Sequence, residues 1–284
     1  MARAITYYYP DESAPSSLKV FQDRSSQIRG FYFTRDRLED IAKVENAGNY
    51  AIYFLLGNDD EHPIPTIYVG QSKNGAGRII DHKYKKTFWS HCIMFVSDNN
   101  AFDTNAIDYM EYYFIQKVIS AGVYSVENKD ERKKEPNVSI YDKPTYDQYI
   151  TQIEFLLQIE GVRLTLPTKK IAGKYYKLRG KGPSAQAYFQ DGEFYLEVGS
   201  IIRPSATKAE SMRSTMDRRE LQIEQLLAEK KIAPSKDDGH YYEVLYPLSF
   251  KSPSTMALFV LGRSANGWTE FVGLDELRES PASE

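Results

Sequence analysis

The chain has 284 residues, of which 42% are hydrophobic and 26% are charged, and its net charge at pH 7 is −3. This length accommodates two domains with separate cores, and the composition is ordinary for a globular protein. The negative charge excludes a polycation, so any surface for nucleic acid has to be a local patch.

The single cysteine, Cys92, excludes an internal disulfide framework and a thiolate metal cluster. No apolar run approaches the ~20 residues of a membrane span. Residues 1–11 are polar and lack the apolar core of a secretion signal. We therefore expect a cytoplasmic protein without membrane association.

The first half predicts an α/β (α+β) unit that spans residues 1–165. Alternating residues predict one or two strands over 18–33, and residues 34–45 predict a helix with Thr34 as its N-cap. Apolar runs then predict strands over 50–56, 66–70 and 89–96. Helical spacing predicts helices over 74–86, 105–121 and 146–159, with polar loops over 57–65 and 127–143.

The second half has a different sequence pattern. It predicts a smaller α+β accessory domain over residues 175–284, after a linker at 166–174. Strands are predicted over 175–179, 185–190 and 193–198, with Asp191-Gly192 as a hairpin turn. A charged helix is predicted over 208–232 and another helix after Ser252-Pro253. Residues 268–272 predict a final strand.

Helical spacing places one carboxylate, Glu111, on an apolar stripe. Ile107, Glu111, Phe114 and Val118 share one face of a helix because they are four, three and four residues apart. A buried carboxylate is costly unless it meets a cation, a metal or several donors. A closed salt bridge to Arg78 and a functional site are both compatible with this position.

Two further side chains share a helical face, because Arg78 and His82 are four residues apart. A converging guanidinium and imidazole suit an anionic oxygen, and the alternative is a solvent-facing arginine with a capping or core histidine. Tyr53 and Tyr68 lie on neighbouring predicted strands, where aromatic residues are equally compatible with core packing. A basic run over residues 73–86 contains Lys73, Arg78, Lys83, Lys85 and Lys86 against a single acid, Asp81. That run is compatible with a solvated face or with a contact to a nucleic-acid backbone.

The order of these residues resembles the GIY-YIG nuclease family. The first tyrosine lies in Ala51-Ile52-Tyr53 and the second in Tyr68-Val69-Gly70. Arg78 follows the second tyrosine by ten residues and His82 follows four later, as the family pattern asks. Glu111 and Asn128 complete the pattern. The resemblance covers about residues 18–162, with a core over residues 48–130.

The resemblance implies a small mixed three-stranded sheet flanked by helices. It implies a metal-dependent endonuclease that hydrolyses phosphodiester bonds, with DNA as the expected substrate and partner. The implied catalytic residues are Tyr53, Tyr68, Arg78, His82, Glu111 and Asn128. Glu111 would bind one divalent ion, Mg²⁺ or Mn²⁺. The implied nucleic-acid contacts are Gln71, Lys73, Lys83, Lys85 and Lys86.

The chain departs from the family pattern at two positions and in one loop. Ala51 stands where glycine is usual, Gln71 stands where several members place a lysine, and the loop over residues 54–67 is long. If that lysine lowers the pKa of a tyrosine, another cation has to do so here, and Lys73 is nearby. Ala51, Gln71 and the negative net charge motivate an alternative interpretation, in which the chain keeps the fold and binds nucleic acid or a partner with little or no catalysis. Residues 175–284 resemble a C-terminal domain of uncharacterised function that is often fused to such nucleases.

Overall fold

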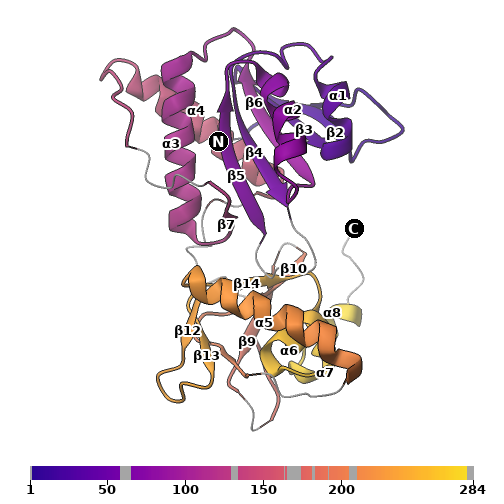
Figure 1. Cartoon of the computed structure of the whole chain (residues 1–284). Helices are drawn as coiled ribbons and strands as arrows, with labels where there is room; N and C mark the ends of the chain where they lie inside the picture. The colour runs from indigo at the N-terminus through magenta and orange to yellow at the C-terminus, as the bar shows by residue number, and fades with distance from the viewer. Residues whose placement is uncertain are drawn as a thin grey trace. The chain divides into compact units, whose positions relative to one another are not determined.

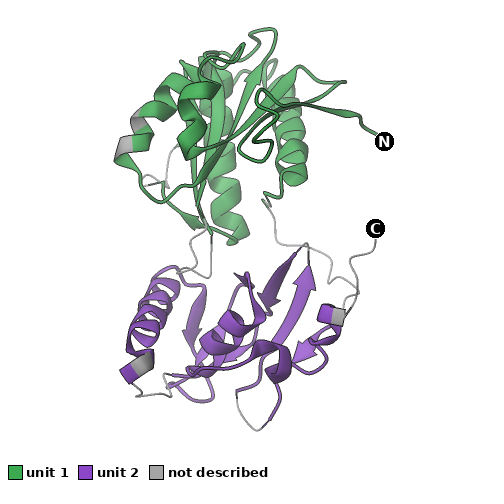
Figure 2. Ribbon diagram, turned by 90° about the vertical axis from the view of Figure 1, so that its right-hand side faces the viewer, with its two compact units in different colours: residues 1–59, 65–166 green, residues 60–64, 167–284 purple. Residues whose placement is uncertain are grey.

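The computed structural model describes residues 2–57, 65–128, 134–162, 164, 174–180, 183–190, 192–204 and 210–279. The chain divides into two compact units, residues 1–59 with 65–166 and residues 60–64 with 167–284 (Figure 2). Each unit has its own hydrophobic core. Residues 166–173 of the expected linker lie outside the described part of the chain.

The first unit is built on a seven-stranded mixed sheet with the order β1-β2-β3-β6-β4-β5-β7 (Figure 1). Its strands are β1 Ile5–Tyr8, β2 Leu18–Asp23, β3 Ile28–Thr34, β4 Ala51–Gly57, β5 Thr66–Ser72, β6 His91–Ser97 and β7 Ser125–Val126. Neighbouring strands are antiparallel, except for β5 and β7, which are parallel.

Helices cover both faces of this sheet. The helices α1 (Leu38–Ile41) and α2 (Gly75–Lys85) pack on one face, and α3 (Thr104–Ala121) and α4 (Lys143–Ile159) pack on the other. Successive residues of a strand point to opposite faces, so Tyr53 packs on the α2 side and Phe54 on the α3 side. Because β4 is buried on both faces, it reads as a continuous apolar run in the sequence.

The α+β class expected from the sequence is confirmed. The strands β4, β5 and β6 correspond to the three strands that the resemblance implies, but four more strands join them in one sheet. Residues 18–33 supply two of these strands, β2 and β3. The patterns do not predict β1, because its side chains alternate between half-buried and exposed and offer no apolar run.

The helix predicted over residues 34–45 is much shorter in the structure. A 3₁₀ turn over Arg35–Arg37 leads into α1, which ends at Ile41. Thr34 occupies the N-cap position, but its side chain makes no capping hydrogen bond there. Only two residues of α1 are buried, so little packing energy supports a longer helix.

The helix α3, which carries Glu111, has well-defined ends. The side chain of Asp103 accepts a hydrogen bond from the backbone N–H of Ala106 at 2.7 Å and caps the first turn. Gly122 ends the helix in a left-handed conformation, with φ of 67°. These local signals determine where Glu111 lies along the helix axis.

The second unit contains two small sheets, with the orders β14-β10-β9-β8 and β11-β13-β12. Its strands are β8 Tyr176–Lys177, β9 Gln186–Gln190, β10 Glu193–Leu196, β11 Ile201–Ile202, β12 Ile232–Pro234, β13 Tyr242–Val244 and β14 Leu248–Phe250. A 3₁₀ turn covers Glu210–Met212, and the helices are α5 Arg213–Ala228, α6 Pro253–Leu261, α7 Gly267–Glu270 and α8 Glu276–Glu279. Within the described ranges, no helix in either unit is long and apolar enough to cross a membrane.

The strand predicted over residues 268–272 is wrong for its first three residues, because α7 covers Gly267–Glu270, whereas Phe271 forms an antiparallel β-bridge with Leu178. The side chain of Asn266 accepts a hydrogen bond from the backbone N–H of Trp268 at 3.2 Å and caps the turn. A Cβ at Gly267 would lie 1.8 Å from the carbonyl oxygen of Pro253, so this glycine allows α6 and α7 to pack closely. The aromatic residues suggested a strand, whereas the cap and this close packing favour a helical turn.

Candidate active site

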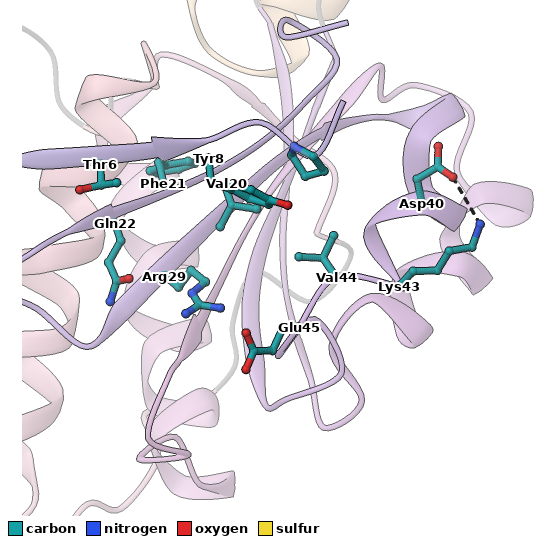
Figure 3. A pocket seen from close by; sticks show the side chains of 11 residues that line it. Thr6, Tyr8, Val20, Phe21, Gln22, Arg29, Asp40, Lys43, Val44 and Glu45 are labelled. Carbon is teal, nitrogen blue, oxygen red and sulfur yellow. Dashed lines mark hydrogen bonds and ion pairs between the residues drawn. The ribbon is translucent and has the colours of Figure 1, made fainter. Parts of the chain in front are cut away.

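Cavities in the described part of the first unit include two that differ in size and in the chemistry of their lining. The larger one has a volume of about 590 Å³ and lies between the β1–β2–β3 part of the sheet and the segment around α1 (Figure 3). Its charged groups are largely balanced, because Arg29 pairs with Asp98 at 2.9 Å and Lys43 contacts Asp40 at 3.5 Å. It contains none of the residues that the resemblance implies.

The smaller cavity, of about 460 Å³, is the candidate active site. Its lining comprises Tyr53, Tyr68, Gln71, Ser72, Lys73, Asn74, Arg78 and Glu111. These residues come from β4, β5, α2 and α3 and from the turn between β5 and α2. Ser72 and Asn74 were not expected here. Their signal in the sequence is a short polar turn directly after a strand, in which Ser72 Oγ accepts a hydrogen bond from the backbone N–H of Asn74.

The two tyrosines lie on the same face of the antiparallel β4–β5 pair. Tyr53 is opposite Gly70, and Tyr68 precedes that glycine by two residues, so the tyrosine rings are diagonal neighbours with centroids 6.3 Å apart. A Cβ at Gly70 would lie only 2.5 Å from the phenol oxygen of Tyr53. The glycine of the second triplet therefore provides the space that the tyrosine of the first triplet occupies.

The departure at Ala51 is accommodated in the core of the unit. Ala51 is fully buried on the α2 face of the sheet and packs in the same cluster as Ala47 and Ala76. It lies opposite Ser72 in the strand register, away from the crowded position of Gly70. Of the long loop between the triplets, residues 58–64 lie outside the described part of the chain.

The helix α2 brings His82 to the tyrosine pair. His82 is 8% exposed, and its Nε2 lies 2.9 Å from the phenol oxygen of Tyr53. Its ring centroid is 5.4 Å from that of Tyr68. Gly75 starts the helix with φ of +42°, and a Cβ there would lie 1.8 Å from the carbonyl oxygen of Ala47. This tight start determines how the Arg78 and His82 face of α2 meets the sheet.

Burial is the main reason that the pKa of Tyr53 is raised above the usual value for tyrosine. The neighbouring Tyr68 raises it further, whereas the positive charge of Arg78 acts in the opposite direction. Tyr53 is 1% exposed and keeps its proton at neutral pH. Its hydroxyl can therefore donate to Nε2 of His82 when that nitrogen carries no proton.

Tyr68 has a different environment from Tyr53. It is half-buried, and the ammonium of Lys86 lies 4.1 Å from the centroid of its ring. Lys86 is the first residue after α2 and does not line the cavity. The sequence suggested that it contacts a nucleic-acid backbone, but the structure places it against the tyrosine.

The remaining cations occupy two different positions. Arg78 and Lys73 line the cavity and are exposed to solvent. Lys83 and Lys85 lie outside the cavity lining, and Nζ of Lys83 is 3.5 Å from a carboxylate oxygen of Glu39. Lys73 and Arg78 of the basic run therefore lie at the cavity, whereas Lys83 and Lys85 lie elsewhere on α2.

Glu111 lies where the helical spacing predicted. It is 7% exposed, on the buried face of α3 that also carries Ile107, Phe114 and Val118. It lines the same cavity as Arg78 and the two tyrosines. This arrangement counts against a purely structural Arg78–Glu111 pair that closes off the space between the strands and helices.

Gln71 points to α3 and away from the tyrosine face of the sheet. Its side-chain amide nitrogen donates a hydrogen bond to a carboxylate oxygen of Asp108. Asp108 precedes Glu111 by three residues, so the two carboxylates lie on neighbouring parts of one helical face. The Gln71–Asp108 contact connects the end of β5 to the turn of α3 that carries Glu111. The sequence did not indicate this role for Asp108.

Asn128 does not line the cavity, but it is hydrogen-bonded to β5, the strand that carries Tyr68. Its side-chain oxygen accepts a hydrogen bond from the backbone N–H of Val69 at 3.0 Å, and its amide nitrogen donates to the carbonyl of Val69 at 2.8 Å. The backbone of Glu127 bonds to Ile67 just before it. The two hydrogen bonds of the Asn128 side chain thus extend the parallel β5–β7 ladder to Val69.

The cavity can offer a metal ion few protein ligands. Among the described residues, Glu111 is the only carboxylate that lines it, and no group of three or more histidine, cysteine, aspartate or glutamate side chains there could hold a metal. Mg²⁺ binds oxygen ligands, keeps several waters and often relies on substrate phosphates. This donor set therefore fits a weakly held Mg²⁺ or Mn²⁺ that gains ligands from a bound nucleic acid.

Comparisons with known proteins identify only the second unit. Residues 176–276 match a family model described as a domain of unknown function (DUF4357). This match supports the expectation of a C-terminal domain of uncharacterised function. No GIY-YIG family model matches the chain, and no curated protein or solved structure is significantly similar to it. The nuclease resemblance of the first unit thus depends on its own residues and geometry.

Proposed function

We propose that the first unit is a metal-dependent endonuclease that hydrolyses phosphodiester bonds, with DNA as its expected substrate. One observation carries the proposal. Tyr53, Tyr68, Arg78 and Glu111 come from four separate elements and line one cavity. A phenol, a guanidinium and a carboxylate at one cavity supply a base, a phosphate ligand and a metal ligand.

The rim of the cavity suits a phosphate group. The exposed guanidinium of Arg78 would hold a non-bridging phosphate oxygen, and its contribution would be greatest in the transition state, where negative charge develops. Lys73 would contact the neighbouring backbone and help to fix its position without reading its sequence. Lys83 and Lys85 would extend this contact along α2.

The two tyrosines would have different roles. Tyr53 holds its proton strongly because it is buried, so it suits a hydrogen-bonding role beside His82. Tyr68 is half-buried, lines the cavity and lies beside an ammonium group. Tyr68 would therefore orient or deprotonate the attacking water.

Glu111 would hold the divalent ion. A bound Mg²⁺ or Mn²⁺ supplies a Lewis acid that stabilises negative charge on the leaving oxygen. The chain's own contribution is to keep this carboxylate at the cavity, through the buried face of α3 and the Gln71–Asp108 hydrogen bond. Asn128 would contribute indirectly, because it holds the β5 strand that carries Tyr68.

The test is a cleavage assay with the purified full chain and the variant Glu111→Gln. The substrates are supercoiled plasmid and duplex, single-stranded and branched DNA and RNA, each with Mg²⁺ or Mn²⁺. We expect cleavage by the wild-type chain and its loss in the variant, while Glu135→Gln retains it. Glu135 is a matched control because it is exposed and lies outside the cavity lining. Undiminished cleavage by Glu111→Gln would contradict the proposal.

A second candidate function is binding of nucleic acid, or of a protein partner, without cleavage. The observation that favours it is the small number of metal ligands at the cavity, together with a glutamine at position 71 where several GIY-YIG nucleases have a lysine. A chain that retards DNA in a gel but cuts none of the substrates in either metal would support this alternative.

A further inference from the structure

We infer that Lys86 is a positioning residue that holds Tyr68 in place and does not bind the nucleic-acid backbone. The inference rests on the proposed function in one respect, namely that Tyr68 acts in phosphodiester hydrolysis. It deepens that function by separating Lys86 from the other lysines of the basic run. Nothing in the chain's order of residues distinguishes Lys86 from Lys85 or Lys83.

The ammonium group of Lys86 lies over aromatic rings. Nζ of Lys86 lies 4.1 Å from the ring centroid of Tyr68 and 6.0 Å from that of Phe88. A cation within about 6 Å of an aromatic centroid is attracted by the negative face of the ring. The ammonium therefore contacts two rings, and a phosphate would have to draw it away from both.

The backbone around Lys86 is hydrogen-bonded on both sides. The N–H of Lys86 donates to the carbonyl of His82 at 3.0 Å, which ends α2 at this residue. The guanidinium of Arg35 donates to the carbonyls of Lys83 and Thr87, which flank the position. The segment thus presents the Lys86 side chain to Tyr68 from a fixed base.

The residues that follow Lys86 in the chain are closely packed. A Cβ at Gly57 would lie 2.1 Å from the carbonyl oxygen of Phe88, so this segment packs closely against the end of β4. Trp89 is buried, and the guanidinium of Arg35 lies 5.4 Å from its ring centroid. Lys85, by contrast, is exposed. Two adjacent lysines therefore have different environments.

The position of Lys86 limits the orientations that the ring of Tyr68 can adopt. A half-buried tyrosine at the mouth of a cavity can adopt several ring orientations unless a neighbour restrains it. The face of the ring toward Lys86 is occupied, and His82, Tyr53 and the cavity surround the rest. The phenol oxygen is thereby kept in one orientation relative to Arg78 and Glu111, which line the same cavity. An ordered phenol lowers the entropy cost of proton transfer.

The experiment compares Lys86→Met, Lys86→Arg and Lys85→Met in the full chain. Cleavage of supercoiled plasmid is measured as kcat and KM, and affinity for a labelled DNA duplex is measured at several salt concentrations in the Glu111→Gln background. We expect Lys86→Met to lower kcat by about tenfold or more, because a positioned acid or base contributes at least that much. KM, affinity and the salt dependence of affinity stay at their wild-type values.

The two other variants make this result specific. Lys86→Arg keeps a cation over the ring and restores most of kcat. Lys85→Met removes a lysine that the proposed function assigns to the nucleic-acid backbone, so it weakens binding and lowers the salt slope by about 1. Melting temperatures of all variants show whether a loss of activity comes from unfolding, and Lys86→Arg provides the test if Lys86→Met does not fold.

Three outcomes overturn the inference. The first is a weaker affinity and a lower salt slope in Lys86→Met, which would assign Lys86 to the nucleic-acid backbone. The second is an unchanged kcat in this variant while the wild type cleaves, which leaves the proposed function intact. The third is a wild-type chain that cleaves none of the substrates, whether or not it binds them, which overturns the proposed function as well.

Discussion

The phenol oxygen of Tyr53 lies 2.9 Å from Nε2 of His82, although the two residues come from β4 and α2 and are separated by 29 positions. This hydrogen bond connects the sheet to the helix at the base of the candidate site. Both tyrosines line the cavity, but their contacts differ, because Tyr53 is hydrogen-bonded to His82 whereas the ring of Tyr68 lies beside Lys86.

From these contacts we expect different effects of Tyr53→Phe and Tyr68→Phe on cleavage. Tyr68→Phe removes the phenol that would act on water, so kcat should fall by about 100-fold or more. Tyr53→Phe removes a buried hydrogen bond and should destabilise the fold by about 1 kcal/mol, with a smaller loss of kcat. Steady-state kinetics and urea unfolding separate the two effects. Equal losses of kcat in both variants would contradict this expectation.

Gly70 is expected to be intolerant of a side chain. Gly70→Ala places a Cβ about 2.5 Å from the phenol of Tyr53, so the buried ring must move and its contact with His82 must weaken. Such overpacking costs typically about 1–3 kcal/mol. Urea unfolding of Gly70→Ala gives the loss of stability. Gly48→Ala is the matched control, since a Cβ at Gly48 meets no atom within 4 Å and its stability should hardly change.

Asn128 should contribute to stability more than to chemistry. Asn128→Ala removes both hydrogen bonds to the backbone of Val69 and leaves that buried strand edge unsatisfied, at a cost of about 1–3 kcal/mol. Asn128→Asp retains the acceptor but loses the donor. Its loss of stability should be smaller than that of Asn128→Ala if the new carboxyl is neutral, and larger if the carboxylate is charged. Exposed Asn105→Ala serves as the control in denaturant unfolding. An unchanged stability in Asn128→Ala would refute this role.

The stability of the first unit should decrease in mild acid because of His91. Burial lowers the pKa of His91 to about 4, below its ordinary value of 6.5. The unfolded chain therefore binds a proton more readily than the folded one, and stability present above pH 6.5 is lost as the pH falls toward 4. This residue can contribute up to about 3 kcal/mol. His91→Gln should flatten the curve of unfolding free energy against pH in this window, measured by urea denaturation.

Divalent metal should bind weakly to the free protein. One lining carboxylate predicts a dissociation constant in the millimolar range for Mg²⁺, since Mg²⁺ depends on waters and substrate oxygens for its remaining ligands. Calorimetric titration of Mn²⁺ or Mg²⁺ into the chain, with Glu111→Gln as the comparison, checks this. Micromolar affinity that survives in Glu111→Gln would place the metal elsewhere.

Much of the local structure could be predicted because its signals lie within single elements. The apolar run of β4, the cap and the glycine at the two ends of α3, and the position of Glu111 on the buried stripe of α3 all follow from residues a few positions apart. The same holds for Arg78 and His82 on one face of α2. Errors arose where such signals conflict, as at residues 268–272, where strand-forming side chains follow a helix cap.

The sequence by itself therefore determined the α+β class, most elements of the first unit and the buried carboxylate of α3. Only the tertiary structure decided that β1 joins the sheet, that Gln71 bonds to Asp108 and that Asn128 bonds to Val69. It also decided which lysine lies on Tyr68. The reason is physical. Periodicity reports which face of an element is buried, whereas contacts between elements depend on strand register and helix docking, which distant residues determine together.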